Sequence, residues 1–510
     1  MRIINNKNKK SKKRIYESFV LPVLFSILFS QVGFVIFSYV SSAENGKLIG
    51  SNLNDISVLT GSTAHLGGGD YFAVSYGNSL FGVVYGNNTN PNCVSVFSIT
   101  TRIVGVADVY GEKGAKIAND MPIEIDSINA LKFLYILEWN DEDSDGVCNF
   151  RRYFDGLDGT TIFGFERIYK GIDLHGAWNI SSIEEISSKN ERIWVFSIYR
   201  VNITYKMINN TISEEALERV QFDFKIKASL NEINGMNYPT YKVSVSKQLG
   251  SFHVDSIEKT GNANYTGKEL AFSSKIDNII DGWDFDQANE HPRLLLESAW
   301  IFGNRASRNV ALWAKEQVMN PQTNGTVHIA SENAEYNISR ENSEYSDTPM
   351  KLSPSPISVA DSWQKIGYLR WVSEVNVTRN QTEYVEESYM QVQAWKQIYF
   401  LNDLAIFEGV ALFCGFSYPY GDKIIHDPEL GSSVYVLNPM AGEKTQRCGL
   451  VGLAITVFAI GTTAIVSSAA GITYIKRKQE QKFFDECIKL EPLNSNKNNR
   501  AEFWEKYVGK

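Results

Sequence analysis

The densest group of side chains that could do chemistry is an acidic turn. Asp141, Asp143 and Asp145 alternate along the chain directly before Gly146. Alternate carboxylates converge on one cation when the chain wraps around it, and the glycine permits the sharp turn. Asn149 follows within reach as a further oxygen ligand. The spacing therefore predicts a structural calcium (Ca2+) site formed by Asp141, Asp143, Asp145 and Asn149.

This turn resembles the D-x-D-x-D-G calcium loops of EF-hands and of many extracellular modules. The resemblance ends early, because the twelfth position, where an EF-hand has a bidentate glutamate, is Arg152. The sequence also shows no pair of helices around the turn. We therefore expect an isolated calcium turn that follows a strand, and a solvated acidic turn without an ion is the alternative.

Two other groups of residues have weaker chemical interpretations. Asp277, Asp281, Asp284 and Asp286 surround Trp283, as in a cation site or a sugar-binding patch, or as a charged turn beside a core tryptophan. A histidine and an aspartate are adjacent at 426–427, but neighbouring side chains on a strand point apart. No H-E-x-x-H, G-x-S-x-G or C-x-x-C motif is present, so the sequence does not predict an enzyme.

Cysteines are few for a chain in an oxidising compartment. The sequence has 5, and the pair that we expect to form a disulfide is Cys93–Cys148. Buried thiols are the alternative, because free cysteine behaves as a small apolar residue in protein cores.

Two long apolar runs predict a membrane topology. Residues 18–43 and 448–475 contain no charged side chain, and each is long enough to cross a bilayer as a helix. Basic residues precede the first run within 1–17, and Lys476, Arg477 and Lys478 follow the second. Because basic flanks favour the cytoplasm, both ends are expected inside the cell and the middle outside. The first run ends in Ser-Ser-Ala, so a cleaved signal peptide is the alternative to an anchor.

Glycosylation motifs agree with this topology. All nine Asn-x-Ser/Thr motifs lie between the two apolar runs. If these sites carry glycans, they must lie at the surface of a secreted or anchored region. The predicted sites are Asn87, Asn179, Asn202, Asn209, Asn264, Asn324, Asn337, Asn376 and Asn380.

The residue pattern in the middle of the chain predicts β-strands. From Val220 to Leu230 apolar and polar residues alternate, which is the pattern of a strand with one buried face. Similar segments are separated by turn residues such as Asn234-Gly235, and only 213–219 and 308–319 favour helix. The sequence predicts a mainly β chain with an antiparallel β-sandwich-like ectodomain flanked by two transmembrane helices.

A polar stretch at Lys259–Lys268 suggests a boundary between two ectodomain units. The expected organisation is a basic cytoplasmic N-terminus, a transmembrane helix or signal peptide, ectodomain 1, ectodomain 2, a transmembrane helix and a cytoplasmic tail. Their residues are 1–17, 18–43, 44–258, 269–447, 448–475 and 476–510.

Charge and topology together limit the function. Residues 44–447 hold 34 basic and 51 acidic side chains, which argues against nucleic acid as a partner. We expect a membrane-anchored, N-glycosylated cell-surface protein that uses its ectodomain for binding or adhesion, with the lipid bilayer and an extracellular ligand or surface protein as partners. The alternatives are an anchored carbohydrate-active hydrolase with two carboxylates and a structural envelope protein.

Overall fold

A computed structural model describes most of the predicted ectodomain. The described residues are 53–62, 69–76, 79–111, 114–148, 150–153, 161–164, 166–207, 212–248, 251–307, 327–331, 334–338, 350–352, 357–360, 365–401 and 405–437. Both apolar runs, residues 1–17 and 476–510, and the segment 308–319 lie outside them. Among the described residues there is no helix with the length and hydrophobicity needed to cross a bilayer.

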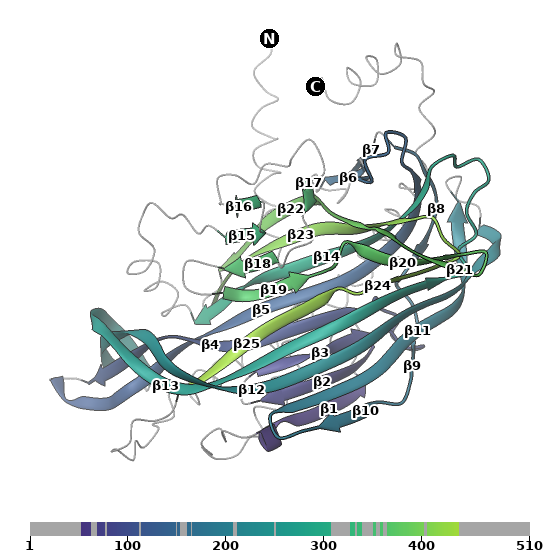
Figure 1. The fold of residues 1–510 in the computed structure, drawn as a ribbon. Helices are drawn as coiled ribbons and strands as arrows, with labels where there is room; N and C mark the ends of the chain where they lie inside the picture. The colour runs from purple at the N-terminus through teal and green to yellow at the C-terminus, as the bar shows by residue number, and fades with distance from the viewer. Residues whose placement is uncertain are drawn as a thin grey trace, which may run out of the picture.

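The described elements are almost all strands (Figure 1). The first part of the chain forms η1 (Leu53–Asp55), β1 (Ser57–Ser62), β2 (Asp70–Tyr76), β3 (Ser79–Tyr85), β4 (Ser95–Tyr110), β5 (Lys116–Asn140), β6 (Phe150–Tyr153), β7 (Thr161–Gly164), β8 (Ile168–Asp173), β9 (Asn179–Ile180), β10 (Glu184–Ser187) and β11 (Glu191–Met207). The middle forms β12 (Ile212–Gln248), β13 (Ser251–Asp281) and β14 (Pro292–Ser307).

The last part forms shorter strands. They are β15 (Val327–Ser331), β16 (Ala334–Ile338), β17 (Met350–Leu352), β18 (Ile357–Ala360), β19 (Lys365–Arg370), β20 (Glu374–Arg379), β21 (Thr382–Glu387), β22 (Tyr389–Leu401), β23 (Ala405–Pro419), β24 (Lys423–His426) and β25 (Glu429–Leu437). The chain is therefore mainly β, as predicted.

These strands form two sheets, one of 23 strands and one made of β6 and β7 alone. In the large sheet, one series of antiparallel neighbours runs β1-β2-β3-β4-β5-β14-β23-β22-β17. A second series runs β10-β11-β12-β13, after which β13 pairs with both β24 and β25. Two links join the series: β4 pairs with β12 in parallel, and β8 pairs with both β5 and β11.

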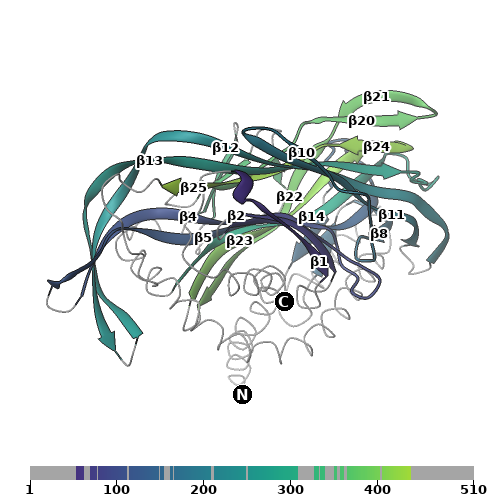
Figure 2. The same ribbon diagram turned by 90° about the horizontal axis from the view of Figure 1, so that it is seen from below.

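The two series face each other as layers (Figure 2). Phe133 of β5 stacks on Phe222 of β12 with ring centroids 4.5 Å apart, and Phe72 of β2 meets Phe196 of β11 at 4.9 Å. All four rings are buried within one large core cluster. Burying aromatic faces between two layers is a main source of stability for such a fold.

The alternation from Val220 to Leu230 is confirmed as a strand. Every second residue is apolar, and side chains of this set such as Phe222 and Phe224 are buried. The polar residues between them are partly or fully exposed. The strand is longer than the pattern, because β12 continues through Asn234-Gly235. There the register with β13 shifts, and Gly235 has a φ of 79°.

The beginning of β12 corrects one expectation. Residues 213–219 favour helix by sequence but lie in β12, where Leu217 pairs with Ile203 of β11. Local helix propensity amounts to a few tenths of a kcal/mol per residue, so pairing with a neighbouring strand overrides it.

The segment Lys259–Lys268, where the sequence suggests a domain boundary, lies within β13. It pairs with β12 from Tyr241↔Lys259 to Glu232↔Lys268. Strands from the two sides of this segment also pair directly, as β5 does with β14. The structure thus describes 259–268 as paired strand rather than as a connecting loop.

Candidate calcium-binding turn

The acidic turn begins where β5 ends. The backbone N–H of Asn140 donates to the carbonyl of Arg167 (2.9 Å), and that of Asp141 donates to the carbonyl of His291 (2.9 Å). The side chain of Asn140 accepts a further bond from the N–H of His291 (2.9 Å). The start of the turn is therefore held by two other parts of the chain, the segments that precede β8 and β14.

Carboxylates also fix the turn from within. Asp141 accepts from the N–H of Gly146 (3.1 Å), and Asp145 accepts from the N–H of Val147 (2.6 Å). Ser144 and Gly146 both have positive φ values, 60° and 73°, which close the turn tightly. Acidic side chains that accept backbone N–H groups are positioned before any ion binds.

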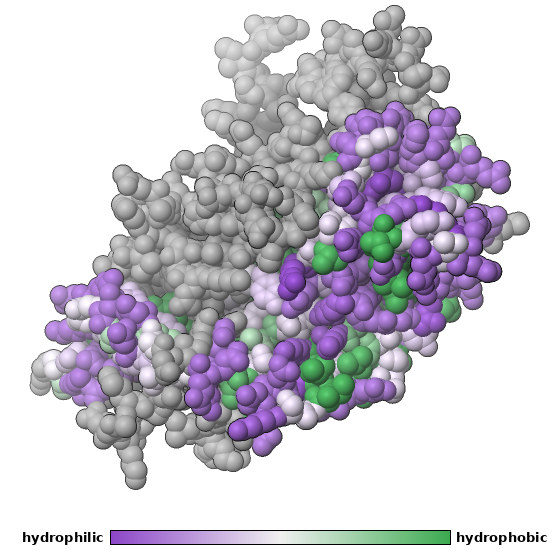
Figure 3. Space-filling model, in the orientation of Figure 1, coloured by the Kyte–Doolittle hydropathy of each residue, from purple (hydrophilic) through white to green (hydrophobic). Residues whose placement is uncertain are grey.

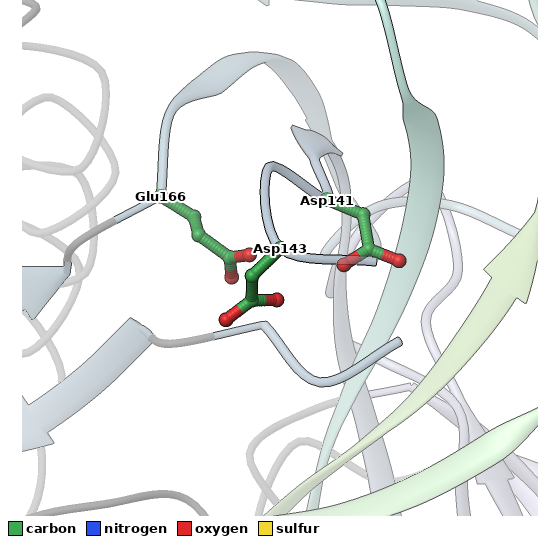
Figure 4. Close-up of side chains that lie close together, drawn as sticks. All are labelled: Asp141, Asp143 and Glu166. Carbon is green, nitrogen blue, oxygen red and sulfur yellow. The ribbon is translucent and has the colours of Figure 1, made fainter. Parts of the chain in front are cut away.

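Three carboxylates come together at this turn (Figure 4). Ligand oxygens of Asp141, Asp143 and Glu166 all lie within 4.8 Å of one another. Asp141 is buried, Asp143 is exposed and Glu166 is half-buried, so one side of the group faces solvent. Three anionic oxygens suit a hard cation such as Ca2+, which takes six to eight oxygen ligands and accepts water or carbonyl groups in the remaining positions.

The structure agrees only in part with the predicted ligand set. Asp141 and Asp143 lie together as the alternation predicts, but Asp145 is not among the three converging carboxylates, and Asn149 lies outside the described residues. Glu166 takes part although the sequence pattern does not indicate it. Its position follows from the pairing of β5 with β8, which brings the start of β8 beside the end of β5.

Electrostatics at the turn favour a bound cation. Burial raises the pKa of Asp145, and the neighbouring charges of Asp143 and Asp141 raise it further. A cation in contact with the turn is Arg293, whose Nε lies 3.8 Å from Oδ2 of Asp141. Arg293 also donates to Ser417 (3.0 Å) and lies over the Tyr389 ring, so it serves several partners and offsets only part of the negative charge.

The end of the turn is anchored to β22 by a buried side chain. Gln391 accepts from the N–H of Cys148 (2.8 Å) and donates to its carbonyl (2.7 Å). Cys148 is buried in a small core cluster with Tyr135 and Leu137 of β5, whereas Cys93 is buried in the large core cluster. The Cys93–Cys148 disulfide stays a prediction.

The second acidic group is dispersed among separate partners. Asp277 pairs with Lys275 (3.3 Å), and Asp284 pairs with Lys170 (3.4 Å). Trp283 is buried, and its indole N–H donates to Glu138 (3.1 Å). These contacts match the charged turn beside a core tryptophan rather than one convergent cation or sugar site.

His426 is a core residue. Its Nδ1 lies 3.2 Å from the Tyr418 hydroxyl and its Nε2 lies 2.9 Å from the carbonyl of Val372. Burial lowers the pKa of His426 to about 4. Asp427 turns away and binds Lys275 at 2.9 Å, so the two adjacent residues do not form an acid–base pair.

The predicted glycosylation sites occupy different surroundings. Five of the asparagines are exposed, namely Asn179, Asn202, Asn264, Asn376 and Asn380. Asn87 is half-buried and donates to Asp70 (2.7 Å). Asn337 lies in β16, while Asn209 and Asn324 lie outside the described residues. Exposure is what glycosylation requires, and occupancy stays a prediction.

Comparison with known proteins adds no relative: no family model, no curated protein and no solved structure matches this chain.

Proposed function

We propose that this chain is a membrane-anchored, N-glycosylated cell-surface protein whose β-sandwich ectodomain binds a partner protein at the cell surface. The anchoring part rests on the two charge-free apolar runs and their basic flanks. The exposed sequon asparagines between the runs support an extracellular middle. The two facing layers of antiparallel strands support the sandwich.

The observation that carries the binding part is a group of exposed apolar side chains at the β20–β21 hairpin. Tyr384 of β21 and Tyr420 are 44% and 38% exposed and both lie beside Arg379, whereas Val385, which is 64% exposed, lies on the opposite face of the same strand. The guanidinium of Arg379 lies over the rings of both tyrosines and pairs with Glu386. Tyrosine and arginine are enriched at protein interfaces, because they combine large apolar area with polar tips.

The hairpin is placed at an edge of its layer (Figure 2). Among the described strands, β21 pairs only with β20, so its other edge has no strand partner there. In the view of Figure 3 the described surface is mainly polar, with apolar residues in small separate patches. Such a surface fits a soluble ectodomain with a local contact site.

Calcium is the proposed structural ligand. In this proposal the ion occupies the turn between Asp141, Asp143 and Glu166, and it neutralises carboxylates that repel one another. Its role is to hold the ectodomain rigid rather than to take part in catalysis.

Cell adhesion measurements test the binding proposal. A cell line displaying the full chain is expected to aggregate with, or attach to, partner cells, and the double substitution Tyr384→Ser, Val385→Ser is expected to reduce attachment at least several-fold. The matched control is Val201→Ser on β11, which removes an apolar side chain that is 47% exposed elsewhere. Equal loss with both variants, or no loss at the hairpin, would count against this contact site.

A further inference from the structure

A buried lysine lies against a single carboxylate away from the calcium turn. Lys170 of β8 is 4% exposed, and its Nζ lies 3.4 Å from Oδ2 of Asp284, which is 58% exposed. The same ammonium lies 4.4 Å from the centre of the Tyr205 ring. Among the described residues, Asp284 is the one acidic group within ion-pair distance of Lys170.

Asp284 is held in place on both sides. Its own N–H donates to the Tyr205 hydroxyl (3.1 Å). The preceding Trp283 donates its indole N–H to Glu138 (3.1 Å), and Asp286 donates its N–H to the same carboxylate (3.0 Å). Glu138 is fully buried on β5 and is the cross-strand partner of Lys170, so the two side chains share one face of the sheet.

We propose that Lys170 and Asp284 condense to form an internal isopeptide bond. Transfer of one proton within the ion pair leaves a neutral amine and a neutral carboxyl group. The Nζ lone pair attacks Cγ of Asp284, the Nζ–Cγ bond forms, and one Cγ–O bond breaks. The departing oxygen leaves as water with a proton from the nitrogen. One amide and one water replace the amine and the acid, and no atom is oxidised or reduced.

The surroundings favour this condensation in three ways. The two reacting groups are already in contact, and such positioning is equivalent to effective molarities of about 10⁵–10⁸ M in well-oriented systems. A neutral amide also removes the unfavourable burial of the Lys170 ammonium. The exposed side of Asp284 gives the released water a path to solvent.

Two further carboxyl groups support the same step. A hydrogen bond with Asp284 raises the pKa of Glu215, so a second carboxyl group lies beside the carboxylate that must become neutral. Burial raises the pKa of Glu138, against hydrogen bonds from Asn289 and Trp283. We assign Glu138 as a positioning residue, because it fixes Trp283 and Asp286 on either side of Asp284.

Mass spectrometry of the denatured and digested full-length chain tests the proposal. The expected result is a linked peptide pair containing Lys170 and Asp284, lighter than the sum of the two peptides by one water, with no trypsin cleavage at Lys170. Recovery of both peptides unlinked from the folded wild-type chain overturns the proposal. The peptide containing Lys275 is the internal control. Its ion pairs with Asp277 (3.3 Å) and Asp427 (2.9 Å) are shorter than the Lys170–Asp284 pair, but its side chain is 46% exposed, and it is expected to stay unlinked.

Variants separate the reacting groups from the positioning residue. Lys170→Arg keeps the charge but lacks the amine, so complete loss of the linked pair is expected. Glu138→Gln and, as a milder change, Trp283→Phe are expected to lower the yield of linked peptide several-fold, with circular dichroism showing that the strands persist. An unchanged yield in a folded Trp283→Phe chain overturns the positioning role, and a linked pair in Lys170→Arg overturns the assignment of the nucleophile.

Discussion

At the scale of single residues, the carboxylates of the acidic turn differ in burial and in their contacts. Asp141 is buried and accepts backbone N–H bonds, so it is part of the folded turn whether or not an ion is present. Asp143 is exposed, and Glu166 comes from a different part of the chain. Substitutions at Asp143 and Glu166 should therefore affect ion binding more than folding.

The first prediction concerns these two side chains. Calcium in excess is expected to raise the melting temperature of the wild-type chain, because a ligand at about 100 times its Kd stabilises a native state by about 2.7 kcal/mol. Asp143→Asn with Glu166→Gln should abolish most of this shift, measured with calcium and with a chelator. Glu142→Gln removes an exposed charge from the same turn and is the control. A shift that survives in the double variant would place the ion elsewhere.

The second prediction concerns pH and His426. Burial lowers its pKa to about 4 in the folded chain, whereas an unfolded histidine titrates near about 6.5. The unfolded state therefore binds more protons between these values, and stability falls as the pH drops through this window. From pH 7 to pH 5 this group should contribute about 2 kcal/mol to the loss.

Urea unfolding of wild type and His426→Gln at the two pH values measures this effect. The difference between the pH values should shrink in the variant by about that amount. His291→Gln, at an exposed histidine, should leave the difference unchanged. If both variants keep the wild-type pH dependence, His426 does not titrate as its surroundings indicate.

At the scale of elements, the turn depends on a glycine that has no room for a side chain. Gly146 has a φ of 73°, and a Cβ built there would lie 2.2 Å from Cε2 of Tyr389. Gly235, in the β12–β13 hairpin, has a similar φ of 79° but nothing within 4 Å of a Cβ. The two positions share a left-handed backbone conformation and differ in the space around a Cβ atom.

The third prediction follows from this difference. Gly235→Ala should destabilise the ectodomain by about 1–2 kcal/mol, the strain of an L-residue in the left-handed region. Gly146→Ala should lower the stability by more than this, because the turn must also move away from Tyr389. The stabilisation of this variant by calcium should also be weaker than that of the wild type. Denaturant unfolding of both variants provides the comparison, and equal losses would show that the Tyr389 contact relaxes easily.

How much the sequence could predict depends on the range of the interactions. The period-two pattern from Val220 identifies β12 because side-chain alternation is local. Asp141 and Asp143 are found together for the same reason. Glu166 and the strand at 213–219 are not predictable in this way, because both depend on pairing with other strands, β5 and β11, and not on the local side-chain pattern.

At the scale of the whole molecule, the proposed topology and the surface of the sheets make one joint prediction. Expressed in full in a eukaryotic host, the chain should carry glycans at exposed asparagines. Asn202→Gln and Asn264→Gln should each increase gel mobility by one glycan. Asn237→Gln, at an exposed asparagine outside any motif, should not change it. Mobility unaffected by enzymatic deglycosylation would contradict a lumenal route for the middle of the chain.

The pairing of β13 with the last strands has a consequence for how this protein is made. β12 and β13 are complete by Asp281, but β13 finds its other neighbours only in β24 and β25, which end at Leu437. Contacts between such distant residues make folding slow. The second edge of β13 must therefore stay unpaired until the chain has been synthesised as far as β24 and β25. A chaperone that shields unpaired strand edges would have its longest task here, until the residues just before the second apolar run emerge.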